Sequence, residues 1–312
     1  MNYTLNQLQI FVKVAEMLSI TKASEVLHMT QPAVSIQLKN LQDQFEIPLV
    51  EVIGKKIHIT EFGKEVYLMA KNILNEVDNV KQRVKSYKGD LSGKLIISIV
   101  STGKYVMPYF LSDFLALHPQ IDLSMDVTNK SKVIESLQNN QIDFALVSLL
   151  PKDLAVNKIE LIENELFFVG NKHEKKIKSP LKKSELNKMP IILREEGSGT
   201  RHMMETFFKK NKIVLEKKIE LTSNEAVKQA VIAGLGKSIL PLIGIRNELK
   251  SGDLQIIPTS GFPLKSKWQI IWLKGKKLSP IAEAYIKHLN TYKESILKQY
   301  FMLDKSKKMP LY

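Results

Sequence analysis

The sequence predicts an α/β protein with a helix-rich N-terminal domain. Three observations support this fold class. The first sixty residues carry a helix-turn-helix pattern followed by a short basic hairpin, residues 61–88 form one uninterrupted helical pattern, and the remaining chain alternates between strands and helices. The length of 312 residues allows about two or three domains.

Two short helices joined by a tight turn are predicted between residues 20 and 39. In the first helix Ala23 is small enough for another helix to touch, and Val26 and Leu27 are expected to face inward. The helix should break at residues 28–30. Helical hairpins also occur in the cores of globular proteins, so this pattern alone leaves a purely structural role open.

The second helix of the pair should begin after Thr30, whose hydroxyl can cap it, and Pro32 fits its first turn because the missing N–H is no loss there. Its apolar residues recur at helical spacing and form the core-facing stripe of an amphipathic helix. They are Val34, Leu38, Leu41 and Phe45. The opposite face is polar or small, which suits a helix that enters the DNA major groove. We therefore predict a DNA-reading helix-turn-helix.

Residues 50–53 and 56–59 are expected to form two short strands around Gly54 and Lys55, which is a wing whose lysines can reach phosphates. The candidate DNA-binding residues are Ile20, Thr21, Lys22, Ala23, Thr30, Gln31, Pro32, Ala33, Ser35, Ile36, Lys39, Lys55 and Lys56. Base edges are expected for Gln31, Pro32, Ser35, Ile36 and Lys39, and phosphates for Lys22, Lys55 and Lys56. The aliphatic Ile36 can touch a thymine methyl group.

Charge and composition limit the function classes. The formal net charge is +14, but residues 1–60 hold five lysines and five acidic residues, so most of the excess is expected to be solvated surface. The absence of cysteine excludes disulfides, thiolate metal sites and a cysteine nucleophile. No run approaches the roughly 18 apolar residues of a membrane span, and residues 1–9 lack a secretory signal pattern. A cytoplasmic protein without membrane partners is therefore expected.

The long helix predicted at residues 61–88 carries a narrow apolar seam, as in a coiled coil. The seam consists of Phe62, Val66, Met69, Ile73, Val77, Val80, Val84 and Tyr87. We expect this seam to pair two protomers, and the alternative is a helix packed on its own domain. The polar and glycine-rich residues 88–93 then predict a hinge.

After the hinge, alternating strands and helices predict a mostly parallel sheet covered by helices. The first set comprises strands at 95–100, 121–127 and 142–149 with helices at 104–117 and 130–138. The second set comprises strands at 165–169, 191–193, 218–221, 238–240 and 268–273 with helices at 200–210, 224–233 and 280–297. Because the two sets are similar and the chain returns late, we expect two lobes with a cleft between them.

The predicted domains are 1–60 for the helix-turn-helix, 61–91 for the linker helix and hinge, 92–300 for the two lobes, and 301–312 for a tail. Lobe I is expected at about 92–163 and 267–300, and lobe II at about 164–266.

Over essentially its whole length the chain resembles the LysR-type transcriptional regulators. The segments that carry the resemblance are 5–11, 19–39 with its Thr30-Gln31-Pro32-Ala33 turn, 47–49 and 60–63. The second half is most similar to regulators of Calvin-cycle operons (CbbR-type), through 101–105, 193–201 and 223–230. The resemblance implies a winged helix-turn-helix, a linker helix that pairs two protomers, and a two-lobe effector domain shaped like a periplasmic binding protein. It also implies double-stranded DNA with a pseudo-palindromic operator, a small anionic metabolite, a homodimer or homotetramer, and RNA polymerase if the protein activates transcription.

The strongest candidate for an effector site is the loop Gly197–Arg201, where a helix start favours an anion. Two of the four arginines, Arg194 and Arg201, flank this loop. In a chain that otherwise uses lysine, bidentate binding of a carboxylate or phosphate is one reason for arginine at these positions. The alternative is a helix cap with ion pairs to nearby glutamates. Two further polar segments follow strands and should reach the same cleft, although each can simply cap a helix. The candidate effector-binding residues are Ser101, Thr102, Gly103, Thr128, Asn129, Lys130, Ser198, Gly199, Thr200, Arg201 and Asn224.

Enzymatic patterns are missing from the sequence. Residues 197–199 do not form a G-x-S-x-G elbow, and no histidine and acid have the spacing of a triad or metal site. We therefore expect no catalytic residues, no metal and no cofactor. Three rival interpretations remain: a solute-binding protein, which would need a signal peptide and no winged domain; a metabolic enzyme, which would need an acid-base constellation; and an effector-independent DNA binder with a collapsed cleft.

Overall fold

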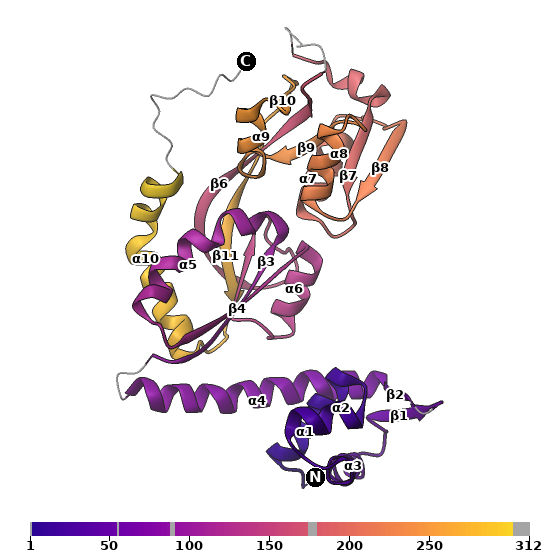
Figure 1. Cartoon of the computed structure of the whole chain (residues 1–312), viewed down its shortest axis with the longest axis vertical. Helices are drawn as coiled ribbons and strands as arrows, with labels where there is room; N and C mark the ends of the chain where they lie inside the picture. The colour runs from indigo at the N-terminus through magenta and orange to yellow at the C-terminus, as the bar shows by residue number, and fades with distance from the viewer. Residues whose placement is uncertain (1, 55, 88–90, 174–179, 302–312) are drawn as a thin grey trace. The chain divides into compact units, whose positions relative to one another are not determined.

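The computed structural model describes residues 2–54, 56–87, 91–173 and 180–301. The chain divides into two compact units, Met1–Asp90 and Leu91–Tyr312, which we call the N-terminal and the C-terminal unit (Figure 1). Among the described helices, none is long and apolar enough to cross a membrane.

The N-terminal unit is a three-helix bundle with a hairpin and a long fourth helix. Its elements are α1 (Leu5–Met17), α2 (Ile20–Leu27), α3 (Gln31–Gln42), β1 (Val50–Ile53), β2 (Lys56–Ile59) and α4 (Glu61–Tyr87). Each of the first three helices is capped at its start by a side-chain hydroxyl that accepts a hydrogen bond from a backbone N–H of the first turn. The capping residues are Thr4, Ser19 and Thr30. The antiparallel pair of β1 and β2 is the predicted wing.

The core of this unit explains the pattern of the sequence. Ala23 and Val34 are fully buried, so α2 and α3 pack closely where the small residue was noted. The prediction that Val26 faces inward is wrong, since half of its side chain is exposed. The reason is that α2 has only eight residues, and the ones it buries are Ala23 and Ser24.

Helix α4 divides its apolar seam between two environments. Near its start Val66 and Ala70 are buried in the core of the N-terminal unit. Further along the seam Met69, Val80 and Val84 are each more than half exposed. The start of α4 therefore packs on its own domain, as the alternative prediction stated. The exposed remainder of the seam stays a predicted dimer contact.

The C-terminal unit consists of one long sheet, one short sheet and the helices that cover them. Its first elements are β3 (Gly93–Val100), η1 (Ser101–Tyr105), α5 (Met107–Leu117), β4 (Ile121–Thr128), α6 (Lys130–Gln138) and β5 (Phe144–Val147). They are followed by β6 (Val156–Asn171), η2 (Lys183–Lys188), β7 (Pro190–Arg194), α7 (Gly199–Lys210), β8 (Lys217–Leu221), α8 (Asn224–Ile232), β9 (Ser238–Pro241), η3 (Leu242–Gly244), α9 (Arg246–Ser251), β10 (Leu254–Ile256), β11 (Leu264–Leu273), α10 (Pro280–Ile296) and η4 (Leu297–Phe301).

The prediction of a mostly parallel sheet is wrong for the large sheet. Its strand order is β10-β6-β11-β5-β3-β4, with β9 also paired to β6. Only β3 makes parallel pairs, with β4 and β5, whereas every pair that involves β6 or β11 is antiparallel. The cause is that the chain leaves the first lobe through β6 and returns through β11, so these two strands run in opposite directions.

These two strands connect two lobes, each with its own core (Figure 1). Lobe I contains β3, β4, β5, α5, α6 and α10, and lobe II contains β7, β8, β9, β10, α7, α8 and α9. Strand β6 places Leu161 in the core of lobe I and Phe168 in that of lobe II. The pairing of β6 with β11 is interrupted by one register shift, between Trp268 and Gln269.

Several predicted boundaries are corrected. The helix expected at 104–117 begins only at Met107, because Pro108 lies in its first turn and residues 101–105 form a separate tight helical turn. The strand expected at 142–149 is shorter, β6 and β11 are longer than expected, and β10 and α9 were missed.

Candidate functional site

The exposed face of α3 agrees with the placement expected for a DNA-reading helix. Ile36 is 57% exposed, and Gln31, Pro32, Ser35 and Lys39 are exposed as well. Their exposure follows from the burial of Val34, Leu38 and Leu41 on the opposite side.

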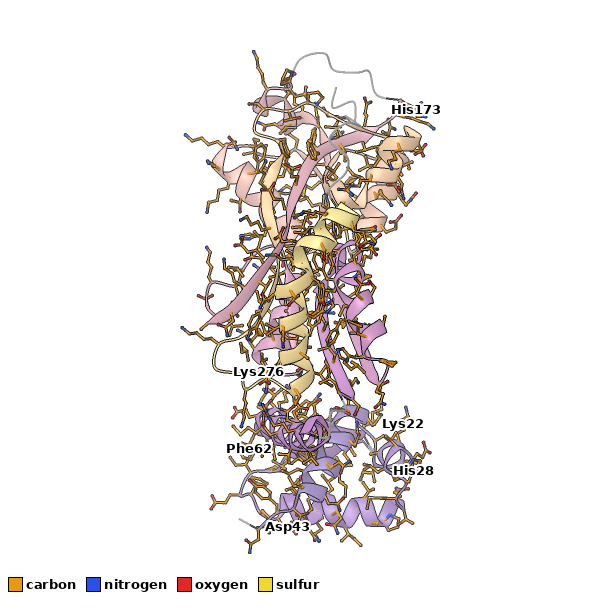
Figure 2. All side chains as sticks on the ribbon, turned by 90° about the vertical axis from the view of Figure 1, so that its left-hand side faces the viewer. Lys22, His28, Asp43, Phe62, His173 and Lys276 are labelled. Atoms are coloured by element: carbon orange, nitrogen blue, oxygen red, sulfur yellow. The ribbon has the colours of Figure 1, made fainter. Side chains whose placement is uncertain are left out.

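The other DNA-binding candidates differ in their surroundings. Lys22 lies on the outer surface of the N-terminal unit (Figure 2), and Thr21, Thr30 and Lys56 are exposed. Ile20 and Ala33 are half-buried. The side chain of Ala23 cannot reach DNA, because it is fully buried and packs α2 against its neighbours. Lys55 lies outside the described residues.

Between the lobes of the C-terminal unit lies a narrow pocket with a cavity volume of about 10 Å³, room for about one water molecule. Its lining combines the starts of three helical segments, η1, α6 and α7, with β7 and α8. The lining residues are Val100, Ser101, Thr102, Asn129, Lys130, Ser148, Arg194, Ser198, Gly199, Thr200 and Asn224. Most of the predicted effector residues therefore come together. Gly103 and Thr128 do not line it, and a Cβ at Gly103 would meet Leu146 at 2.8 Å.

The hydroxyl of Ser101 is the centre of the polar contacts in this pocket. Arg194 donates from Nη1 to Ser101 Oγ at 3.2 Å, and Asn224 donates from Nδ2 to the same oxygen at 2.6 Å. A serine oxygen accepts two hydrogen bonds, so the hydroxyl proton of Ser101 remains available to a ligand. Within the described chain, the buried Oδ1 of Asn224 has no hydrogen-bond donor. The residues that line the pocket thus include one available hydroxyl proton and one buried amide oxygen without a partner in the described chain.

Arg194 is one of three lining residues that the candidate set lacked, with Val100 and Ser148, and it is the charged one. Its side chain is 3% exposed and pairs in a bidentate manner with Glu195, with Nε and Nη2 donating at 2.7 and 2.8 Å. The sequence signal was present, because Arg194 flanks the glycine loop in a chain with few arginines. Its position on β7, which ends at the cleft, could be inferred only from the fold.

Backbone groups add to the positive character of the pocket. Ser198 caps α7 and Asn129 caps α6, with Asn129 Oδ1 accepting from the Lys132 N–H at 3.1 Å. The first amides of a helix have no intrahelical partner, and those of Gly199 and Thr200 border the pocket. These amides suit a ligand oxygen that carries negative charge.

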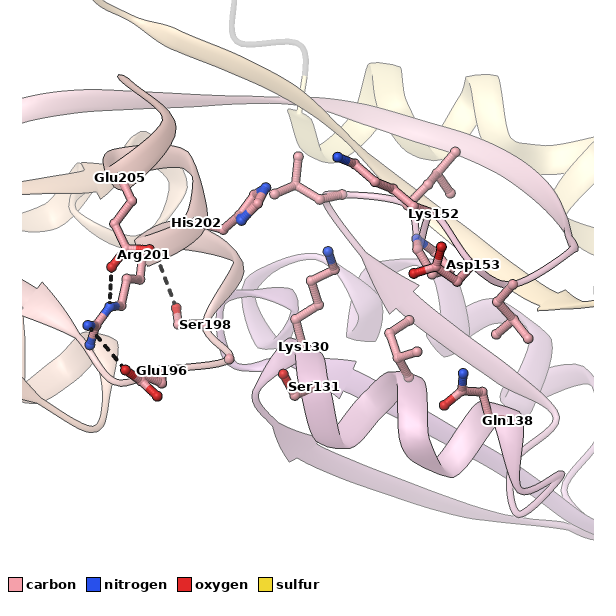
Figure 3. A pocket seen from close by; sticks show the side chains of 16 residues that line it. Lys130, Ser131, Gln138, Lys152, Asp153, Glu196, Ser198, Arg201, His202 and Glu205 are labelled. Carbon is pink, nitrogen blue, oxygen red and sulfur yellow. Dashed lines mark hydrogen bonds and ion pairs between the residues drawn. The ribbon is translucent and has the colours of Figure 1, made fainter. Parts of the chain in front are cut away.

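Arg201 does not line this pocket, although it lines a wider hollow that adjoins it. It donates from Nε to Glu205 at 2.7 Å and from Nη1 to Glu220 at 2.6 Å, and Glu196 lies 3.8 Å from Nη2. These carboxylates raise the pKa of Arg201, chiefly through the Glu205 hydrogen bond. Figure 3 shows the side chain turned toward Glu196 and Glu205 and away from Lys130. The alternative of structural ion pairs is therefore the one observed.

A wider, open hollow of about 800 Å³ adjoins the pocket and shares Lys130 and Ser198 with it. Figure 3 shows Lys130, Lys152 and His202 turned into this hollow. Burial, together with the charge of Lys152, lowers the pKa of Lys130. An anion in the hollow would relieve this repulsion. Within the described part of the chain, no group of acidic, histidine or cysteine residues could hold a metal ion.

With this geometry in view, comparison with known proteins identifies the family. The family "Bacterial regulatory helix-turn-helix protein, lysR family" matches residues 5–64, and "LysR substrate binding domain" matches residues 88–293. The chain belongs to the LysR family of bacterial transcriptional regulators. As the family requires, it has a winged helix-turn-helix and a two-lobe effector domain.

Individual LysR-family relatives extend over nearly the whole chain. The transcriptional activator CmpR of Synechocystis is 37% identical over 298 residues, covering 95% of this chain and 97% of CmpR. The RuBisCO operon transcriptional regulator of Acidithiobacillus ferrooxidans is 37% identical over 287 residues, covering 92% of this chain and 93% of the regulator. The resemblance to the Calvin-cycle subgroup is thereby confirmed.

Among solved structures of the LysR family, the CcmR regulatory domain of Synechocystis PCC6803 in complex with 2-PG is similar to the C-terminal unit. The TM-score is 0.62 at 31% identity, covering 65% of this chain and 98% of the CcmR domain.

Proposed function

We propose that this LysR-family regulator senses a small anionic metabolite in the pocket around Ser101, Arg194 and Asn224. The observation that carries the proposal is the pair of open hydrogen-bonding positions there: the Ser101 hydroxyl proton and the buried Asn224 Oδ1. A buried amide oxygen without a donor is costly, so a ligand that supplies a hydroxyl or protonated group gains from this position.

The charge of the surroundings supports an anion. The amides at the start of α7 and the guanidinium of Arg194 border the pocket, and Lys130 lies between the pocket and the wider hollow. Because Glu195 already neutralises Arg194, the net attraction comes mainly from the amides and Lys130. A phosphate or carboxylate group near the start of α7 would use both.

The same pocket offers a route to regulation, because both lobes line it. Ser101 and Asn129 belong to lobe I, whereas Arg194, Ser198 and Asn224 belong to lobe II. A ligand that touches both sides binds better when the lobes are close, and so favours that arrangement.

For the DNA-binding side, we propose that exposed residues of α3 contact base edges in a pseudo-palindromic operator read by two copies of the chain. Gln31, Ser35, Ile36 and Lys39 support this because they share one exposed face. The exposed seam of α4 supports pairing, in a homodimer or homotetramer. If the protein activates transcription, RNA polymerase is a further partner. The proposed cell compartment is the cytoplasm.

The effector proposal is tested by thermal unfolding and calorimetry of the full chain with 2-PG, phosphoenolpyruvate and inorganic phosphate. The relative CcmR is described in complex with 2-PG, which makes it a reasonable probe. A ligand present at 100 times its dissociation constant adds about 2.7 kcal/mol to the free energy of unfolding. We expect one of the organic anions to stabilise the wild type and Ser101→Ala to lose that stabilisation.

Ser112→Ala is the matched control, because Ser112 is exposed on α5 of the same lobe. It should bind the anion as the wild type does. If the wild type binds none of the three anions, or Ser101→Ala binds like the wild type, the proposed pocket is wrong.

A further inference from the structure

A second cavity spans the two lobes and shares no lining residue with the effector pocket. Its volume is about 360 Å³, at the lower end of the roughly 300–1,000 Å³ of small-molecule sites. Lobe I contributes Lys104, Tyr105 and Tyr109 to the lining. Lobe II contributes Lys228, Arg246 and Glu248.

Arg246 is the feature of this cavity that requires an explanation. Its Nε is buried and has no hydrogen-bond partner within the described chain. Burial lowers the pKa of this guanidinium, Tyr109 partly opposes the shift, and no carboxylate of the described residues raises the pKa. Arg194 and Arg201 differ, because glutamates neutralise both of them. A half-buried cation without a counter-ion is unfavourable, so an anionic ligand is the natural partner for Arg246.

The other charged groups that face the cavity leave a positive excess. Lys228 is neutralised by Glu248 at 2.6 Å and Glu225 at 3.0 Å. Lys104 makes no ion pair in the described part of the chain, and its ammonium lies 5.1 Å from the centre of the Tyr105 ring. The pKa of Glu225, the carboxylate that pairs with Lys228, is lowered chiefly by a hydrogen bond from Gln229, and the charge of Lys104 lowers it further. Among the described residues Arg246 has no paired carboxylate, so the cavity keeps a positive excess.

Aromatic rings form the rest of the wall. Tyr109 and Tyr300 are 42% and 39% exposed, with ring centroids 4.9 Å apart. Exposed tyrosines beside cations provide a surface on which a flat ring can stack while its charged group reaches the arginine.

We propose that this cavity binds a small anion attached to a planar ring, of the kind represented by a nucleoside monophosphate. Arg246 and Lys104 bind the anionic group, and Tyr109 and Tyr300 contact the ring. Because Lys104 and Arg246 belong to different lobes, the ligand favours one arrangement of the lobes and acts as a second input to the regulator.

Calorimetric titration of the full chain with AMP, adenosine and inorganic phosphate tests the proposal. We expect AMP to bind, and both adenosine and phosphate to bind more weakly because each offers only half of the recognised chemistry. Arg246→Gln should weaken AMP binding about tenfold or more, since a hydrogen bond to a charged group is lost. Lys250→Gln is the matched control, because Lys250 is an exposed cation on the same helix.

A competition titration and one further variant distinguish binding in this cavity from binding in the effector pocket and from attraction by charge alone. The anion that binds the effector pocket should not displace AMP, because the two sites share no lining residue. Tyr109→Leu should weaken AMP binding without changing the affinity for phosphate. Arg246→Gln should unfold at the same temperature as the wild type or higher, because it removes an uncompensated buried charge.

The proposal is overturned if the wild type does not bind AMP, or if Arg246→Gln binds it with unchanged affinity. Equal affinity for AMP and inorganic phosphate would overturn the role of the tyrosines. If light scattering gives Tyr109→Leu a molecular mass different from that of the wild type, the rings belong to a subunit contact. That result would also overturn their role in ligand binding.

Discussion

Gly197 lies where the two lobes touch. Replacing it with alanine should weaken effector binding, and the further substitution Ser131→Gly should restore most of the affinity. Its φ is +80°, and its carbonyl oxygen accepts the N–H of Ser131 from the opposite lobe at 3.2 Å. A Cβ at this position would lie 2.6 Å from Ser131 Oγ and 3.0 Å from Ser131 Cβ. Gly197→Ala therefore has two costs of different origin.

The first cost is conformational and lies within the loop of lobe II. A non-glycine residue in the left-handed region costs roughly 1–2 kcal/mol, so the free energy of unfolding should fall by about that amount whether or not ligand is present. The second cost is the collision with Ser131, which exists only while the lobes are together. Overpacking costs typically about 1–3 kcal/mol, which corresponds to about a 5- to 150-fold loss of effector affinity.

The double variant Gly197→Ala/Ser131→Gly separates the two costs, with Ser131→Gly as the single-site control. Calorimetry with the anion that binds the wild type should show the affinity largely restored in the double variant. Thermal unfolding should show the stability still reduced. Wild-type affinity in Gly197→Ala, or no recovery in the double variant, would show that contact between the lobes at Ser131 is not part of the ligand-binding arrangement.

Three other substitutions have expected outcomes. Arg201→Gln should lower the unfolding temperature, because Glu205 and its neighbours lose their cation, yet leave anion affinity unchanged; a loss of affinity would return Arg201 to the effector pocket. Gly63→Ala should prevent stable folding of the N-terminal unit, as seen by loss of operator binding, because its Cβ would collide with the backbone oxygen of Leu49; normal operator binding would contradict this. Burial lowers the pKa of His288, so the unfolded state binds the proton better and stability is lost as the pH falls below about 6.5. The unfolding temperature should drop less between pH 7.5 and 5.5 in His288→Phe than in the wild type, and an equal drop would rule out this histidine as the cause.

The sequence predicted elements best where local signals were complete. The wing and α3 were found at their observed positions, because Thr30 and Pro32 mark the start of the helix and its apolar stripe is regular. The long strands β6 and β11 were predicted only in part. Residues 156–164 of β6 and 264–267 of β11 were left out, because polar residues are frequent there and obscure the strand pattern. Their antiparallel direction depends on where the chain crosses between lobes, and no local pattern encodes that crossing.

The candidate site was predicted in its location more reliably than in its chemistry. Helix starts that follow strands predicted that Ser101, Asn129 and Ser198 lie close together, and all three line one pocket. The choice between Arg194 and Arg201 depended on side-chain direction. Arg194 ends a buried strand, whereas Arg201 lies in the first turn of α7, within reach of several glutamates. Periodicity alone does not reveal such partners.

The paired strands β6 and β11 limit the ways in which the lobes can move. Their ladder of hydrogen bonds prevents sliding, so the lobes can only bend or twist about the strands. The register shift between Trp268 and Gln269 lies within this ladder, and bulges of this kind increase local bending and twist. Because Trp268 is buried in the core of lobe I, this shift bends the ladder inside lobe I. A ligand that closes the pocket tilts one lobe about the strands that connect it to the other. The displacement grows with distance from these strands and is largest at the outer surfaces of the lobes.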